Sequence, residues 1–229
     1  MYKNSINNQC FEPSTLFQYK TEFNGQIYTK SLVEIFVELQ ENPDMIMYVP
    51  VVSDICRKDS EDKSEKRENG VYGSTVMWQE ARLCETQSSQ CVTIVVDRKP
   101  DVNHTELECG RIRVTPNHVF VVEKDGVLKE EEAYLVEEGE KILFDGHRVY
   151  AEDESPLFIS EDGEIAAEDL LSEGTEHTVD TVPVKKCSVA KNYNKKKPWT
   201  FYGIVLTNSA DKYVLMPTGL ISHDSSVTY

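Results

Sequence analysis

The sequence lacks the features that would place it among membrane, secreted or nucleic-acid-binding proteins. It contains no apolar run long enough to cross a bilayer and no basic N-terminus followed by an apolar segment, so neither a transmembrane helix nor a secretory signal is predicted. Lysine and arginine are scarce, with 24 against 40 aspartate and glutamate residues, which gives a formal net charge of −16. This balance disfavours nucleic-acid binding, because phosphate contacts need clustered positive charge. We therefore expect a soluble, cytoplasmic and monomeric protein that contacts neither nucleic acid nor membrane.

Paired cysteines are also missing. The six cysteines form no CxxC pair and lie at positions 10, 56, 84, 91, 109 and 187. A disulfide scaffold would be denser in cysteine, and a zinc site would have paired ligands. We therefore predict reduced thiols, most of them buried as small apolar side chains and one or two reactive, with no metal and no organic cofactor.

Short strands and turns make up most of the pattern that is present. One helix is predicted from Ser31 to near Pro43, and a turn at Asn24-Gly25. Strands are predicted at 71–78, 92–97, 111–115, 118–123 and 141–145, and in two stretches after residue 199. Exposed loops are predicted for the charged segment 57–70 and the basic segment 184–197, and an acidic, less regular region for 147–183 with a helix near 166–174. This pattern indicates a mostly β domain with curved or closed sheets.

Three separated segments carry residues suited to acyl-transfer chemistry. Cys10 follows a mostly polar nine-residue segment and begins the first patterned stretch of the chain. Thr115 and His118 form a TxxH segment at the end of a predicted strand. Near the C-terminus, the apolar stretch from Gly219 leads into His223-Asp224-Ser225. Each segment alone is a weak signal, but their order along the chain is informative.

In this order the three segments resemble the intein/hedgehog (Hint) family of self-processing domains, over essentially the whole stretch from Cys10 to Ser225. The resemblance implies a mostly β, horseshoe-shaped fold of curved strands with pseudo-two-fold symmetry, one or two short helices and inserted acidic loops. It divides the chain into an N-terminal flank (1–9), a self-processing domain (10–224) and a C-terminal flank (225–229). An endonuclease would sit in the insertion region, about 147–195. The gap between His118 and Thr200, about 80 residues, is too short to hold one, so a mini-intein is expected.

The resemblance also implies roles for six residues. Cys10 would attack the carbonyl of Gln9 to form a thioester, with Thr115 holding the junction and His118 acting as general acid and base near neutral pH. Ser225 would then accept the N-terminal flank. His223 would assist cleavage after the last residue of the domain, Asp224.

The C-terminal end departs from the family pattern. The family has a cyclising Asn where this chain has Asp224, and a carboxylate is a poor nucleophile. Gly203 and Tyr213 stand where an acidic residue and a second histidine are common. Autocatalytic splicing in cis is therefore expected to be slow or blocked at its last step, in a single-turnover reaction that acts on the chain's own flanks.

Two other functions remain open from the sequence. One is a Hint domain that performs N-terminal cleavage only, or transfers the acyl group to an external nucleophile. The other is a catalytically silent β-rich module that binds a protein partner. An added thiol should release residues 1–9 from a Hint domain whose Cys10 forms a thioester. A binding module would keep its mass, so this test separates the two functions.

Overall fold

A computed structural model gives the fold of the chain. It describes the residue ranges 9–22, 26–53, 72–96, 110–145, 148–150, 156–160, 163–165, 176–194, 196–207, 212–216 and 220–225. Three of the predicted features lie outside the described residues, namely the turn at Asn24-Gly25, the loop 57–70 and the helix near 166–174.

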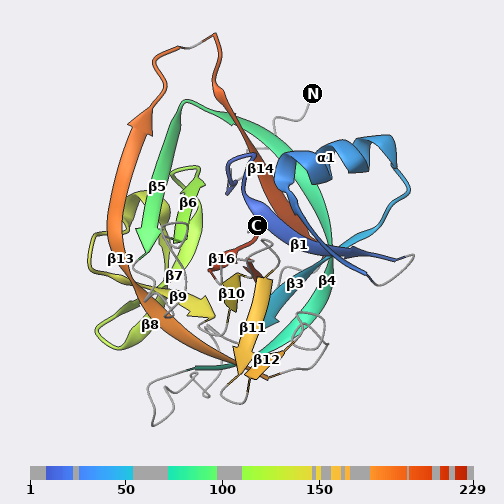
Figure 1. Cartoon of the computed structure of the whole chain (residues 1–229). Helices are drawn as coiled ribbons and strands as arrows, with labels where there is room; N and C mark the ends of the chain where they lie inside the picture. The colour runs from blue at the N-terminus through green and yellow to red at the C-terminus, as the bar shows by residue number, and fades with distance from the viewer. Residues whose placement is uncertain are drawn as a thin grey trace.

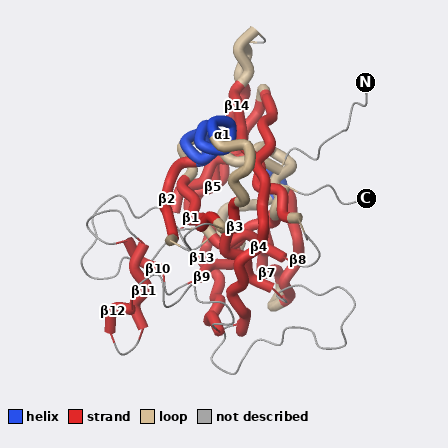
Figure 2. Tube along the Cα trace, turned by 90° about the vertical axis from the view of Figure 1, so that its right-hand side faces the viewer, coloured by secondary structure: helices blue, strands red, loops and turns tan. Residues whose placement is uncertain are grey.

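Thirteen strands form one large antiparallel sheet. They are β1 (Leu16–Thr21), β2 (Ile27–Ser31), β3 (Met47–Ser53), β4 (Tyr72–Ser88), β5 (Gln90–Val96), β6 (Gly110–Val114), β7 (Val119–Lys124), β8 (Val127–Glu132), β9 (Lys141–Asp145), β13 (Glu176–Lys191), β14 (Trp199–Leu206), β15 (Lys212–Leu215) and β16 (Ile221–His223). A separate three-stranded sheet, visible beside the main one in Figure 2, consists of β10 (Arg148–Tyr150), β11 (Pro156–Ser160) and β12 (Gly163–Ile165).

Two long strands give the main sheet its horseshoe outline. β4 and β13 curve along opposite sides of the molecule (Figure 1) and pair with each other near their first residues. β14 pairs with the second half of β4, from Trp199 opposite Ser88 to Leu206 opposite Ala81. The mostly β, curled architecture predicted from the sequence is thus confirmed.

The single α-helix of the described residues, α1 (Leu32–Glu41), follows β2 directly. Ser31 caps its N-terminus by accepting a hydrogen bond from the Glu34 N–H, and the Glu34 carboxylate accepts one from the Ser31 N–H. This reciprocal cap explains why the helix begins here. Leu32 and Ile35 are buried against the sheet. No helix among the described residues is long and apolar enough to span a membrane.

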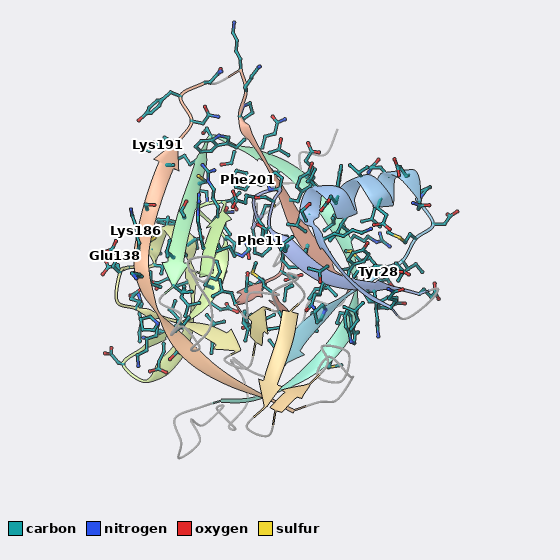
Figure 3. The ribbon with its side chains drawn as sticks, in the orientation of Figure 1. Phe11, Tyr28, Glu138, Lys186, Lys191 and Phe201 are labelled. Atoms are coloured by element: carbon teal, nitrogen blue, oxygen red, sulfur yellow. The ribbon has the colours of Figure 1, made fainter. Side chains whose placement is uncertain are left out.

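Two long strands differ from the sequence prediction. β4 continues ten residues past 78, because it pairs with both β3 and β14. The basic segment 184–197 was predicted to be a loop, but residues 184–191 belong to β13 and pair with β5. Val184 is buried while Lys186 and Lys191, labelled in Figure 3, are exposed. The charged residues occupy the solvent face of a half-buried strand, which conceals the strand pattern in the sequence.

Candidate functional site

The structure brings the three separated segments together in the interior. Cys10 precedes β1, Thr115 and His118 lie in the turn between β6 and β7, and Asp224-Ser225 follows β16. All five side chains are buried. Backbone pairing of Phe11, labelled in Figure 3, with both Tyr202 of β14 and Val114 of β6 holds the first segment in place.

Thr115 holds both backbone groups of Cys10. The Cys10 N–H donates to the Thr115 Oγ1 at 3.0 Å, and the Thr115 N–H donates to the Cys10 carbonyl at 2.9 Å. The N–H of the Gln9–Cys10 peptide bond is therefore held in one orientation by the Thr115 hydroxyl. Such fixation reduces the reorganisation that a reaction at this bond would need.

His118 lies under the same junction, with its ring between Phe11 and Phe120. Its Nε2 is 2.5 Å from the Ser222 Oγ, while Nδ1 is buried without a fully formed hydrogen bond to any described residue. Burial, with a smaller contribution from the charge of His223, lowers the pKa of His118 to about 3, and the Gln9 backbone opposes this shift. The lowered pKa keeps the imidazole neutral in the folded chain near neutral pH, because the folded protein excludes water from the ring.

Ser225 reaches the N-terminal junction from the other end of the chain. Its hydroxyl donates a hydrogen bond to the Gln9 carbonyl oxygen, across 216 positions of sequence. The Ser225 N–H donates to the Ile204 carbonyl of β14 at 2.6 Å, which fixes the backbone behind that hydroxyl. The hydroxyl that would accept an acyl group thus contacts the carbonyl that would supply it.

Gly203 leaves the space in which these groups meet. A Cβ atom on this residue would lie 2.7 Å from the Ser225 Cβ and 2.8 Å from the Cys84 Sγ, and closer still to the Ser225 Oγ. The backbone of β14 can approach the junction only because this position has no side chain. Gly203 lacks the acidic side chain that is common at this position in the family. The space beside it is occupied by the Ser225 and Cys84 side chains and is not a cavity.

We expect the substitution Gly203→Ala to destabilise the fold by about 1–3 kcal/mol, because the added methyl group overpacks this contact. Urea unfolding of the variant and the parent measures the change. A second substitution, Ser225→Gly, removes two of the atoms that the new Cβ would meet, so the double variant should regain most of the lost stability. Additive losses in the double variant would contradict this account.

At the C-terminal junction, the His223 ring contacts both the backbone carbonyl and the side-chain carboxylate of Asp224. Its Nδ1 lies 2.9 Å from the Asp224 carbonyl oxygen and 3.1 Å from the carboxylate Oδ1. The other carboxylate oxygen, Oδ2, accepts a hydrogen bond from the Leu206 N–H at 3.2 Å. Burial lowers the pKa of His223, but hydrogen bonds and charge from Asp224, with the charge of Glu130, outweigh burial and raise it above its ordinary value.

Three residues of the site were not found from the sequence. Ser222 contacts His118, Cys84 lies beside Gly203, and Glu130 lies 4.0 Å from the His223 Nε2. Glu130 is held by a hydrogen bond from the Tyr213 hydroxyl at 2.9 Å, and the Tyr213 ring packs edge-on against His223. Cys84 and Glu130 lie on strands far in sequence from either junction, so only strand pairing reveals them. Ser222 was adjacent to a predicted site residue and could have been identified from that position.

The described residues offer no group of three histidine, cysteine, aspartate or glutamate side chains arranged to hold a metal ion. The residues named above place two thiols, three hydroxyls, two imidazoles and two carboxylates around two peptide bonds. These groups are suited to nucleophilic attack and proton transfer at carbonyl carbon.

No protein-family model matches the sequence, and no curated protein matches it. Solved structures do match. The Pab PolII intein, solved by NMR, is 15% identical with a TM-score of 0.54, covering 94% of this chain and 100% of that one. The TvoVMA intein is 14% identical with a TM-score of 0.53, covering 94% and 98%. The transcription factor IIB Mvu mini-intein is 13% identical with a TM-score of 0.52, covering 94% and 99%. The chain therefore has the Hint fold seen in these intein structures.

Proposed function

We propose that this chain is a self-splicing domain, residues 10–224, that acts on its own flanks, residues 1–9 and 225–229. One observation carries the proposal: the Ser225 hydroxyl donates to the Gln9 carbonyl, so the two ends of the domain meet at one carbonyl group. A binding module has no need to bury both junctions together. The reaction is a single-turnover acyl transfer rather than multiple-turnover catalysis.

In the first step, the Cys10 sulfur attacks the Gln9 carbonyl carbon, and the Gln9–Cys10 amide becomes a thioester. Thr115 holds the leaving nitrogen through the 3.0 Å hydrogen bond. His118 begins neutral, since its pKa is lowered to about 3. Negative charge that develops on the Gln9 oxygen favours the protonated imidazole, so His118 takes up the proton that leaves the Cys10 thiol and then delivers it to the leaving nitrogen.

In the second step, the Ser225 oxygen attacks the thioester carbon and the Cys10 thiol leaves. The existing contact between Ser225 and the Gln9 carbonyl supports this step, because the acceptor needs little movement. The third step, cleavage after Asp224, is slow. The Asp224 carboxylate is engaged by the Leu206 N–H and by His223, and a charged carboxylate is a weak nucleophile toward its own carbonyl.

The first testable outcome is thiol-dependent release of the N-terminal flank. Incubating the full chain with dithiothreitol should release residues 1–9 and leave a species that begins at Cys10, because the thiol intercepts the thioester. Intact-mass spectrometry measures the release. The matched control Cys10→Ala should keep its full mass under the same conditions.

Different outcomes separate the other functions. An unchanged mass in the parent chain would contradict the proposal and favour a silent binding module. A ligated product from Cys10→Ala would show that Ser225 attacks Gln9 directly, and the thioester step would then be wrong. Thiol-dependent release with no ligated product, even from the Asp224→Asn variant, would favour a cleavage-only Hint domain.

A further inference from the structure

Cys84 lies in the part of the site that the proposed reaction has not used. It sits on β4 directly opposite Gly203 of β14. Phe11 pairs antiparallel with Tyr202, so Cys10 comes opposite Gly203 on the other side of β14. Residues directly opposite one another on neighbouring strands direct their side chains to the same face of a sheet. Cys10 and Cys84 therefore project on one face, with a glycine between them.

The glycine allows the two sulfur atoms to interact. With no Cβ at Gly203, the space above β14 is filled by the Cys84 Sγ and the Ser225 side chain, both within contact distance of where that Cβ would be. Cys10 and Cys84 also pack in one buried cluster with Phe201. A third cysteine of that cluster, Cys91, accepts a hydrogen bond from the Arg113 Nε at 3.1 Å instead.

We propose that the Cys84 sulfur is the base that takes the proton from the Cys10 thiol in the first step. This proposal rests on the proposed function, since it assigns a residue to that step. As the Cys10 sulfur forms its bond to the Gln9 carbon, the Cys10 S–H bond breaks and the proton passes to the Cys84 thiolate. Cys84 then gives up this proton, which reaches the leaving nitrogen through His118, so Cys84 ends as a thiolate again and no oxidant or reductant is consumed.

Before the attack, the electrostatics around the two thiols place the proton on Cys10 and the negative charge on Cys84. A hydrogen bond from the Cys10 thiol lowers the pKa of Cys84 to about 7; burial opposes the shift, and the Gly203 backbone assists it. The neighbouring Cys84, followed by burial, raises the pKa of Cys10 above its ordinary value. Cys10 therefore stays a thiol near neutral pH unless a partner removes its proton, and Cys84 is the partner in contact with it.

A disulfide between the two cysteines does not fit this arrangement. Residues on either side of an intervening strand have Cα atoms about 9–10 Å apart, which follows from the spacing of neighbouring strands. Disulfide bonds need Cα atoms within about 7 Å. The pair is therefore arranged for proton transfer rather than for a covalent cross-link.

The test compares thiol-dependent release of residues 1–9 in the parent, in Cys84→Ser and in the matched control Cys91→Ser. A serine hydroxyl keeps the size of the side chain but is not a base near neutral pH. We expect Cys84→Ser to slow release about 100-fold near pH 7, and Cys91→Ser to keep the parental rate within about threefold. The Cys84→Ser rate should rise about tenfold per pH unit up to about pH 9, where hydroxide replaces the base, whereas the parental rate levels off near pH 7–8.

If Cys84→Ser releases residues 1–9 at the parental rate and with the parental pH profile, the role proposed for Cys84 is wrong and the proposed function is unaffected. Absence of release from every chain, the parent included, would overturn the proposed function and with it this step. A second readout does not depend on release. Ultraviolet absorbance of thiolates should show one group that titrates near pH 7 in the parent, is lost in Cys84→Ser and shifts to higher pH in Cys10→Ala. An unchanged titration in both variants would also overturn the proposal.

Discussion

Replacing Asp224 by Asn should convert the chain from a stalled precursor into one that splices, with the C-terminal step accelerated about 100-fold or more. An Asn side chain attacks its own carbonyl carbon as a neutral nitrogen, and the Ser225 nitrogen leaves. In the parent the same position carries a carboxylate held in place by Leu206 and His223. The change therefore replaces a weak nucleophile with a competent one in a site that is already formed.

The surroundings of Asp224 determine how the new amide would lie. The Leu206 N–H is a donor and needs an acceptor, so the amide oxygen would take the Oδ2 position. The amide nitrogen would then take the Oδ1 position, next to the Nδ1 of His223. His223 also contacts the Asp224 carbonyl, which the amide must attack. One imidazole can therefore polarise that carbonyl and receive a proton from the nucleophile.

Intact-mass spectrometry of Asp224→Asn follows the outcome directly. The expected products are the excised domain and a ligated peptide that joins MYKNSINNQ to SSVTY. The double variant Asp224→Asn with His223→Ala serves as control, and its C-terminal step should slow by about 100-fold. Free SSVTY without ligated peptide would mean that C-terminal cleavage outruns transfer to Ser225. An Asp224→Asn chain that keeps its mass would contradict the proposed function.

The elements predicted correctly from the sequence are those fixed by residues close together in the chain. The helix α1 was predicted because its cap, Ser31 with Glu34, and its apolar spacing are both within twelve residues. The second half of β4 and most of β13 were missed for the opposite reason. Their pairing partners are distant in sequence, and solvent-facing charges such as Lys186 interrupt the apolar alternation.

The candidate site shows the same division. The sequence placed Cys10, Thr115 and His118 in one site, and the structure places them around one peptide bond. It did not indicate that Cys84 would approach Cys10, because that contact depends on β14 passing between them with a glycine at 203. Nor did it indicate that His118 would be neutral, since a pKa depends on burial that no local pattern reveals.

Replacing His118 by Gln should slow the reaction but make the folded chain more stable in acid. For the reaction, His118→Gln removes the proton carrier at the Gln9–Cys10 bond, so thiol-dependent release should slow about 100- to 1,000-fold. For stability, the variant should become more resistant to acid than the parent. The two effects together distinguish a buried reactive imidazole from a packing residue, which would lose stability at every pH.

The sign of the stability effect follows from the lowered pKa of His118, about 3 in the folded chain against an ordinary value of 6.5. Between these values only the unfolded chain binds the proton, so the parent loses stability as pH falls below about 6.5, by roughly 2–3 kcal/mol at about pH 4.5. Urea unfolding at about pH 7 and 4.5 measures the difference between parent and His118→Gln.

His223→Gln is the matched control, and its effect has the opposite sign. The raised pKa of His223 stabilises the folded chain at low pH, and this contribution is lost as pH rises through the folded value. Equal acid sensitivity in the parent and His118→Gln would show that water reaches the imidazole, and the neutral starting state proposed for the first step would then be wrong.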